Sequence, residues 1–319
     1  MRVTIRTAFS LVVALLASPS VASVAPAGSL ITSGVKLIVY PSPPPSVGFV
    51  RLDAFTPQGA FIRTITTTSP GNLVGPIASD RFGNLLALSD AFGGSLVKIN
   101  DDGSQSSFSV PLQEGASLSP DQNGNVYISY SRISKISPSG QVVAMYTPGT
   151  PFAQFIDLAP DQCTMYFTDT VPTVYRFDVC RGVALPPLAT TLPPGVAGDL
   201  RVLPSGLILV TDGAAGVVLI DPTSGAVVRT YPVPSQLLAL ATDGTSFWAG
   251  GGPLVRRVDL QSGAILATVN TGLDQLNGLT VVGEPRAAFA ASIPTFSPEG
   301  LVALALALAA AGLLAVRRL

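Results

Sequence analysis

The 319-residue chain contains no histidine, and this absence excludes several kinds of functional site. A Ser-His-Asp or Cys-His catalytic site, a histidine-ligated zinc and an imidazole acid–base step all require that side chain. Charged residues make up only 12% of the chain, and the formal net charge is −1. No basic stripe is present, so we expect no nucleic-acid partner.

Long apolar stretches are scarce within the body of the chain and stand out near its two ends. Two arginines within the first six residues precede an apolar stretch from Ala8 to Ala17 and a small-residue site around Ala22. This order is typical of a secretory signal peptide. We therefore expect a signal helix within residues 1–23, with cleavage near Ala22 or Ser23.

The other apolar stretch runs from Leu301 to Val316 and contains only Leu, Ala, Val and Gly. As a helix it would rise roughly 24 Å, somewhat less than the ~30 Å hydrocarbon core of a bilayer. Arg317 and Arg318 follow it, and such a pair favours the cytoplasmic side. The pattern predicts a transmembrane helix over residues 301–316, with the upstream chain outside the cytoplasm.

The residues before this helix carry a short motif, Ile293-Pro294-Thr295, followed by Phe296 and Ser297. With the helix and the terminal arginines, the motif resembles the C-terminal sorting signals of Gram-negative bacteria called IPTL-CTERM, relatives of the PEP-CTERM signals that exosortases read. Phe296 stands where the family usually has Leu.

This resemblance covers residues 293–319 only. It implies export, anchoring in the inner membrane on the periplasmic side, and processing by an exosortase-like sorting enzyme on the way to the cell surface or extracellular matrix. A plain single-span anchor is the alternative interpretation of the tail.

Between the two ends, the chain repeats. Four aspartates each follow a short apolar run at intervals of about 41 residues or twice that, a period in the range of propeller blades; they are Asp80, Asp121, Asp161 and Asp243. A second pattern has an apolar residue, a small polar residue and then a glycine, as tight turns between antiparallel strands require. Its six copies end at Gly59, Gly103, Gly140, Gly182, Gly225 and Gly263.

These repeats predict an all-β fold, a six-bladed β-propeller over residues 30–283. The strands expected for the second blade are 76–79, 84–88, 95–99 and 105–110. The first blade, about 30–69, lacks an inner strand, whereas Gly278 to Val282 is left over after the sixth. Pairing the two ends would close the ring and remove exposed edges. Loose linkers are expected on either side, at residues 24–29 and 284–292.

Several short sequence segments that lead into predicted strands are similar to those of NHL-repeat propellers and of the senescence marker protein and gluconolactonase superfamily. They are Asp80-Arg81-Phe82-Gly83-Asn84-Leu85, Asp121-Gln122-Asn123-Gly124-Asn125-Val126 and Pro204-Ser205-Gly206-Leu207. The resemblance spans most of the chain after the signal peptide, and its motifs are mainly those of the fold. For lactonase-type members it implies a divalent cation held at the channel by Asp, Glu and Asn from different blades.

Polar residues recur near the start of successive predicted inner strands and could converge on the central channel. They are Asn72, Glu114, Gln154, Asp157, Asp199, Gln236 and Asn277. Two carboxylates and two amides would suffice for Ca²⁺ or Mg²⁺; the candidate metal ligands are Asp157, Asp199, Asn72 and Asn277. Alternatively, these groups cap strand ends and solvate the channel, and no cofactor is bound. No residue is assigned a catalytic role.

The two cysteines, Cys163 and Cys180, are equidistant from a predicted turn centred near Val171-Pro172. Residues equidistant from the turn of an antiparallel hairpin face each other, and an exported protein meets oxidising conditions. We therefore predict a structural disulfide in the fourth blade; a metal pair or reactive thiols are the alternatives.

Two functions remain open at this point. The first is an exported, surface- or matrix-sorted propeller that acts as a non-catalytic binding or structural protein, with a polysaccharide or a surface protein as partner. The second is a divalent-metal-dependent, lactonase-like hydrolase that uses the central channel. The first is favoured because the residues form no specific catalytic constellation.

Overall fold

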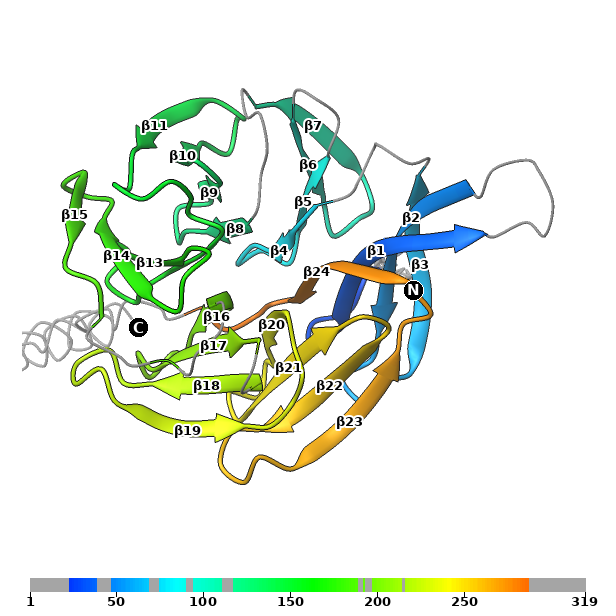
Figure 1. The fold of residues 1–319 in the computed structure, drawn as a ribbon. Coiled ribbons are helices and arrows are strands. Elements are labelled where there is room, and N and C mark those ends of the chain that lie inside the picture. Colours follow the sequence, from blue (N-terminus) through cyan, green and yellow to red (C-terminus); the bar gives the residue numbers. More distant parts are fainter. Residues whose placement is uncertain are drawn as a thin grey trace, which may run out of the picture.

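The computed structural model of the chain describes residues 23–38, 47–68, 75–89, 94–110, 117–188, 192, 197–213 and 216–286. Regular structure in these ranges consists of strands, which form six four-stranded antiparallel sheets. Figure 1 shows the sheets arranged as blades around a common centre. The predicted all-β, six-bladed propeller is confirmed.

Each blade begins with its inner strand at the centre of the ring and continues outwards. Blade 1 consists of β24 (Gln275–Val281), β1 (Leu30–Ile38), β2 (Val47–Phe55) and β3 (Phe61–Thr68). Blade 2 consists of β4 (Ile77–Ser79), β5 (Leu85–Ser89), β6 (Ser95–Ile99) and β7 (Gln105–Ser109), close to the bounds expected from the sequence. Blade 3 consists of β8 (Ser117–Pro120), β9 (Val126–Ser129), β10 (Ile133–Ile136) and β11 (Val142–Tyr146).

The other three blades follow the same plan. Blade 4 consists of β12 (Phe155–Leu158), β13 (Thr164–Thr168), β14 (Val174–Asp178) and β15 (Val183–Leu185). Blade 5 consists of β16 (Ala197–Val202), β17 (Ile208–Asp212), β18 (Gly216–Ile220) and β19 (Val227–Tyr231). Blade 6 consists of β20 (Leu237–Leu240), β21 (Ser246–Gly251), β22 (Leu254–Asp259) and β23 (Ile265–Asn270).

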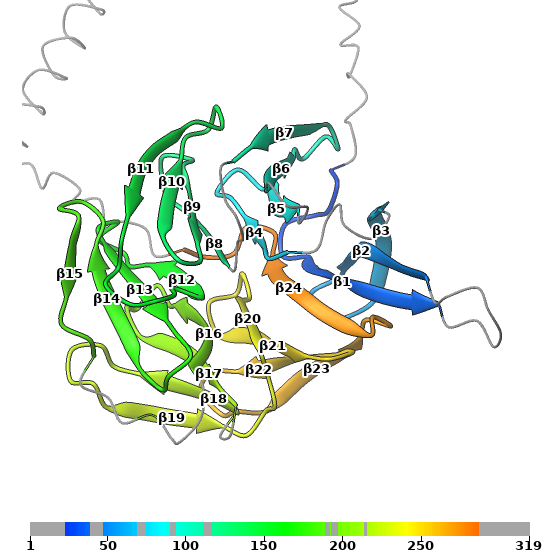
Figure 2. The ribbon, with the colours of Figure 1, turned by 45° about the horizontal axis from the view of Figure 1, so that its top comes forward.

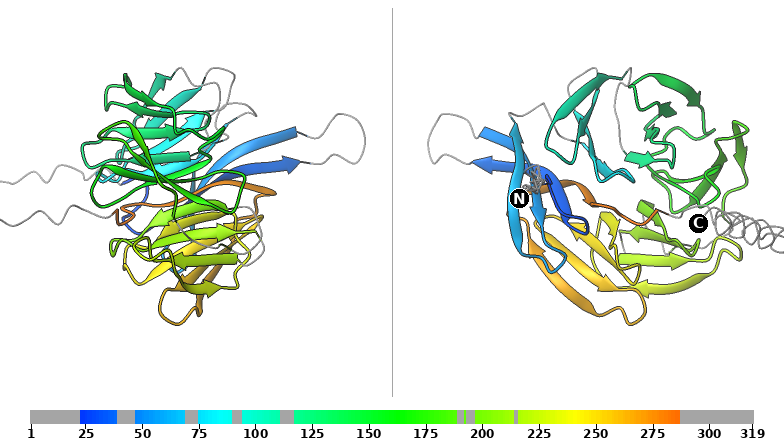
Figure 3. Two further views of the ribbon diagram at one scale, coloured as in Figure 1. Left: turned by 60° about the vertical axis from the view of Figure 1, so that its left-hand side comes forward. Right: turned by 180° about the vertical axis from the view of Figure 1, so that it is seen from behind.

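The ring closes through blade 1, as predicted. Strand β24 pairs antiparallel with β1, so that Leu30 lies opposite Val281 and Thr32 lies opposite Leu279. Figure 2 shows the two strands, from opposite ends of the described chain, side by side in one blade. The far ends of β1 and β2 project from the ring, as Figure 3 shows. Because β24 supplies the inner strand, blade 1 has four strands like every other blade.

The core is divided among the six contacts between neighbouring blades. Each contact holds one cluster of buried apolar side chains; Ile77 and Leu85 pack against blade 1, whereas Ala78 and Leu86 pack against blade 3. Adjacent residues of a strand point to opposite faces, so one strand serves both neighbours. This explains why the inner strands are almost continuously buried.

The repeated aspartates organise the turns between first and second strands. The Asp80 carboxylate accepts hydrogen bonds from Phe82 N (2.8 Å), Asn84 N (2.9 Å) and Asn84 Nδ2 (2.7 Å). Asp121 holds the corresponding turn of blade 3 in the same way. The period of about 41 residues therefore follows a turn that recurs between the first and second strands of successive blades.

Residues 24–29 and 284–286 were expected to be loose linkers, but the structure packs them against the blades. Val24 and Ala25 are buried in the cluster between blades 1 and 2, and Arg63 donates to the carbonyl of Val24. Glu284 is buried as well. The body thus includes residues 24–29 and 284–286, because their apolar and charged side chains have partners in the blades.

The expected signal helix and transmembrane helix lie outside the described residues. Over the ranges that the structure does describe, no helix is long and apolar enough to cross a membrane. Ile293, Pro294, Thr295, Phe296, Arg317 and Arg318 also lie outside those ranges.

The predicted disulfide between Cys163 and Cys180 is confirmed, with a Cα–Cα distance of 5.1 Å. It joins the ends of β13 and β14 beyond their last ladder pair, Thr164 with Asp178. The two residues are 17 positions apart, so the bond closes a short loop within blade 4.

Replacing both cysteines (Cys163→Ala with Cys180→Ala) is expected to lower the free energy of unfolding by about 3 kcal/mol, because the unfolded chain regains the entropy of that loop. Urea unfolding of the oxidised chain and of the variant measures the difference. The wild-type chain under reducing conditions should match the variant. Two reactive thiols on the unreduced chain would show that the bond does not form.

Candidate functional site

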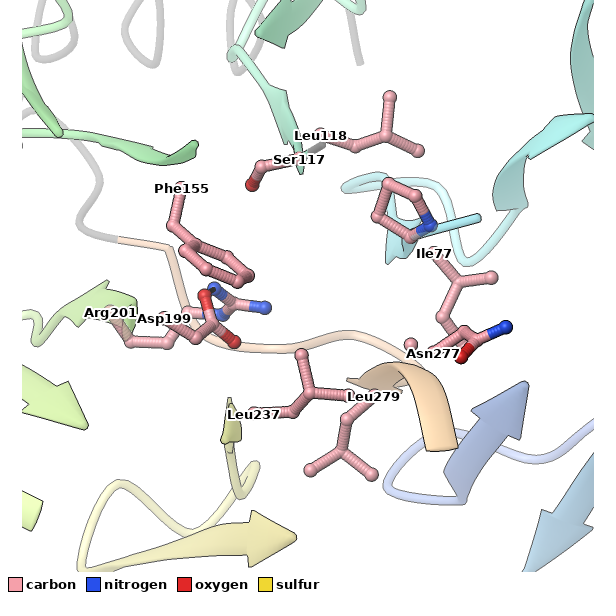
Figure 4. Close-up of a pocket in the computed structure, with 11 residues that line it drawn as sticks. Ile77, Ser117, Leu118, Phe155, Asp199, Arg201, Leu237, Asn277 and Leu279 are labelled. Atoms are coloured by element: carbon pink, nitrogen blue, oxygen red, sulfur yellow. Dashed lines mark hydrogen bonds and ion pairs between the residues drawn. The ribbon is translucent and has the colours of Figure 1, made fainter. Parts of the chain in front are cut away.

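The candidate site is the central channel, where the inner strands of all six blades meet. A cavity of about 20 Å³ lies there, between Asp199 and Arg201 on one side and Asn277 on the other (Figure 4). Phe155, Leu237 and Leu279 also line it. A volume of this size holds about one water molecule. It is too small for a sugar or a lactone.

Asp157 and Asp199 do reach the centre of the ring, but each carboxylate accepts a hydrogen bond from the backbone of the neighbouring blade. Asp157 Oδ2 accepts from Val202 N at 2.9 Å, which joins blade 4 to blade 5. Asp199 Oδ2 accepts from Leu238 N at 2.8 Å, which joins blade 5 to blade 6. Both carboxylates thus satisfy backbone N–H groups that would otherwise be buried without a partner.

Of the other candidate ligands, Asn277 alone is placed with Asp199 at the small cavity. Asn277 lies across the small cavity from Asp199, and Asn72 and Glu114 lie outside the described residues. The main chains of Gln154 and Gln236 are held in blades 4 and 6, where Gln154 N donates to the Thr168 carbonyl and Gln236 N donates to the Gly250 carbonyl. Within the part of the chain that the structure describes, no group of three or more Asp, Glu, His or Cys side chains is placed to hold a metal ion.

The five residues that follow β24, Val282 to Arg286, form what we term the closing segment. In Figure 1 this segment runs from β24 across the centre of the ring towards β16. Its backbone joins blades 1 and 2. Gly28 N donates to the Val282 carbonyl at 2.8 Å, and Gly283 N donates to Ser79 Oγ at 3.1 Å.

Two charged side chains of the closing segment reach the remaining blades. Glu284 Oε1 accepts from Leu240 N of blade 6 at 2.6 Å and lies 3.3 Å from Arg201 Nε of blade 5. Arg286 Nη1 donates to Asp157 Oδ1 of blade 4 at 2.8 Å and to Ser119 Oγ of blade 3 at 3.2 Å. One short segment therefore contacts every blade of the ring.

Arg201 is the centre of this charge network. Its Nη1 lies 2.6 Å from Asp199 Oδ1, and its side chain is only 8% exposed. Burial alone would lower the pKa of Arg201, but the carboxylates of Asp199, Glu284 and Asp157 raise it above its ordinary value. The guanidinium stays charged, and its two closest carboxylates come from blade 5 and from the closing segment.

Burial also raises the pKa of the Asp199 carboxyl to about 6, against the opposing effects of Arg201 and the Leu238 N–H. Desolvation disfavours the charged form and so outweighs the neighbouring positive charge. A raised carboxyl pKa at a channel is often a sign of acid–base chemistry. Here burial is the cause of the raised pKa, and both Asp199 oxygens already accept hydrogen bonds from the protein.

Three residues of this network escape prediction from the sequence: Arg201, Glu284 and Arg286. Arg201 follows Asp199 at a spacing that places both on the same face of a strand. A charged pair in an otherwise apolar strand indicates a buried ion pair, and the sequence offers that signal here. Glu284 and Arg286 fall in the expected linker 284–292, because nothing local in their sequence reveals partners more than 40 residues away.

Comparisons with known proteins support the fold but no family. No family model matches the chain, and no curated protein matches it. A solved structure of a protein of unknown function from Bacteroides caccae is similar, with a TM-score of 0.59 at 16% sequence identity. That similarity covers 81% of this chain and 100% of the other. At this identity the likeness shows a shared fold alone.

Replacing Glu284 with glutamine is expected to lower the free energy of unfolding by roughly 3 to 5 kcal/mol, because Arg201 loses a buried partner and Leu240 N keeps a weaker acceptor. Chemical denaturation measures the change. Arg181→Ala is the matched control, because Arg181 is 81% exposed in its ion pair with Asp178 and should contribute about 0 to 1 kcal/mol. Equal effects of the two substitutions would contradict the network.

The Asp199 carboxyl is expected to titrate near pH 6, as its raised pKa requires. Because the folded chain then binds this proton more tightly than the unfolded chain, stability falls as pH rises from about 4 to 6, on the order of 3 kcal/mol. Carboxyl ¹³C shifts measure the titration. Asp221 is the control, because the Thr223 and Ser224 donors lower its pKa. Titration of both residues below about pH 4 would contradict the assignment.

Proposed function

We propose that this chain is an exported, surface- or matrix-sorted propeller that acts as a non-catalytic binding or structural protein. The proposal rests on the channel carboxylates, whose oxygens already accept hydrogen bonds within the ring. Asp157 and Asp199 each bond a neighbouring blade and an arginine, so their oxygens serve the ring rather than a bound ion. The water-sized central cavity supports the same conclusion.

The export part of the proposal rests on the sequence at the two ends. The signal peptide directs the chain out of the cytoplasm, and the tail with Ile293-Pro294-Thr295 and its apolar run holds it at the inner membrane. An exosortase-like sorting enzyme then acts at the motif, and the propeller reaches the cell surface or extracellular matrix. The disulfide between Cys163 and Cys180 suits an oxidising location.

Processing at or after residue 293 would leave the propeller body whole. The last residue of the closing segment is Arg286, several positions before the motif. The bonds of Glu284 and Arg286 to the blades would therefore survive removal of the tail. A polysaccharide or a surface protein is the partner class for the exposed rims of such a body.

The sorting proposal is tested by replacing Ile293, Pro294 and Thr295 together with alanine, in a Gram-negative host that carries such a sorting enzyme. The variant should be exported and remain in the inner membrane at the mass of the unprocessed tail, whereas the wild-type chain is processed. Cell fractionation and intact mass measure this. Ser297→Ala is the matched control. Identical processing of variant and wild type would contradict recognition of the motif.

A separate assay decides between binder and hydrolase. We expect the purified chain to show no turnover on a panel of lactones, with Ca²⁺ or Mg²⁺ supplied. Turnover that is lost in Asp157→Asn and Asp199→Asn, but kept in a surface variant, would overturn the non-catalytic assignment.

A further inference from the structure

Three neighbouring blades expose a pair of apolar side chains at the start of their outermost strand. In blades 1, 5 and 6 the turn before that strand ends in Gly-Ala, and two large apolar residues follow directly. Each of these six side chains is at least 36% exposed. We term them the apolar rim: Phe61, Ile62, Val227, Val228, Ile265 and Leu266.

The propeller fold alone does not require these pairs. The outermost strand of blade 2 begins at the same place with Gln105 and Ser106. Blades 3 and 4 each expose a single large apolar residue there, Val143 and Val183. Single exposed apolar side chains are common on protein surfaces, whereas a group of them on one edge of neighbouring blades marks an interaction surface.

The apolar rim lies at one end of the blades. In blade 6 the strand register places Leu240 of the inner strand and Ile265 of the outermost strand in one row, through Phe247 and Val258. Corresponding rows cross blades 1 and 5, and each ends at the first residue of the apolar pair. The ends of β1 and β2 that project from the ring lie at the opposite end of the sheets (Figure 3).

The closing segment lies at the inner ends of the same rows. Glu284 Oε1 accepts from Leu240 N at 2.6 Å. Asp157 accepts from Val202 N, at the inner end of the blade 5 row, and from Arg286 Nη1. Arg286 is the last described residue, so the described chain ends at the side of the ring that bears the apolar rim.

An apolar groove opens at this end of the ring, between blades 5 and 6. Its volume is about 460 Å³, and it lies between the β16–β17 turn and two turns of blade 6. Pro204 and Gln261 at its edge are exposed, and the turn with Gln261 leads into Ile265. A volume of this size is within the range of sites that bind small apolar molecules. Four leucines form the apolar part of its wall: Leu203, Leu207, Leu219 and Leu260.

The chain beyond Arg286 is the reason to expect lipid at this surface. Residues 287–300 separate Arg286 from the apolar stretch 301–316, which predicts a transmembrane helix. Fully extended, a stretch of this length reaches about 50 Å at most. A tail inserted in a bilayer would therefore hold the apolar rim near the lipid surface at a high effective concentration.

The charges at this end of the ring do not favour an anionic surface. Asp221 and Asp259 lie in the turns that precede two of the apolar pairs. Hydrogen bonds from Thr223 lower the pKa of the Asp221 carboxyl, and those from Ser262 lower the pKa of Asp259. Both groups are thus charged at neutral pH, so contact with a bilayer depends on apolar area and zwitterionic headgroups suit it better than anionic ones.

We propose that the apolar rim docks onto the lipid bilayer to which the tail anchors the chain. The six side chains enter the boundary between headgroups and acyl chains, and the groove between blades 5 and 6 accepts acyl-chain carbons. The closing segment then faces the membrane, and the projecting ends of β1 and β2 point away from it. The inference rests on the membrane retention proposed above and adds to it a lipid partner and an orientation of the ring.

Brominated lipid tests this arrangement on the full-length chain. Leu266→Trp, reconstituted through its tail into vesicles of dibrominated phosphatidylcholine, should lose much of its added fluorescence relative to vesicles of plain phosphatidylcholine, because bromine quenches indole only at close range. The native Trp248 is 1% exposed and gives a constant background. Val171→Trp is the matched control and should not be quenched, because Val171 is 41% exposed in the β13–β14 turn at the other end of the ring.

A second set of variants separates lipid contact from tethering by the tail. Phe61→Asn with Val228→Asn, added to the Leu266→Trp chain, should reduce the quenching several-fold, because less apolar area enters the lipid. Val171→Asn in the same chain should leave the quenching unchanged. All these positions are exposed, so urea unfolding midpoints should stay the same.

Equal quenching of the Leu266→Trp and Val171→Trp chains, or no quenching of either, would overturn the proposal. Protection of Leu266→Trp from aqueous acrylamide without quenching by bromine would indicate that a second copy of the chain covers the apolar rim, and this too would overturn it. A chain that floats with the vesicles in a density gradient but shows no quenching contradicts this inference alone. A chain that does not float contradicts the membrane retention as well.

Discussion

A buried arginine at the centre of the ring determines how the closing segment must cross the channel. Arg201 is almost fully removed from water, and a charge in that position must be paired and hydrogen-bonded. Its partners are Asp199 of its own blade and Glu284 of the closing segment. Closing the ring is therefore more than pairing β24 with β1. The chain must also return across the channel to neutralise the charge that blade 5 places there.

This arrangement explains why the channel resembles a functional site in sequence and behaves as a structural element in space. Carboxylates repeated at inner strands would suit a divalent cation, yet Asp157 and Asp199 accept from the backbone of the next blade. A propeller whose centre is filled in this way has its usable surface at the rims.

Much of the fold is predictable because its determinants are local. The turn aspartates and glycines recur along the blades, and the cysteines lie at the ends of the two strands of a single hairpin, with Cys163 opposite Val179, one residue from Cys180. Blade number, ring closure and disulfide therefore all follow from the sequence. The charge network does not, because Glu284 and Arg286 find partners that are 44 and 129 residues away in the chain. Likewise, Gln162 has a φ of 57° at a turn position where four other blades have a glycine, and this is visible only once the turns are aligned.

Residues 284–286 hold the ring closed, and two truncated chains provide the test. One chain ends at Gly283 and the other at Arg286, so they differ only in the last residues of the closing segment and keep the same strands. Urea unfolding should show a clearly lower midpoint for the shorter chain, with weaker hydrogen-exchange protection at the amides of Leu240 and Val202. Equal midpoints and equal protection would contradict the account.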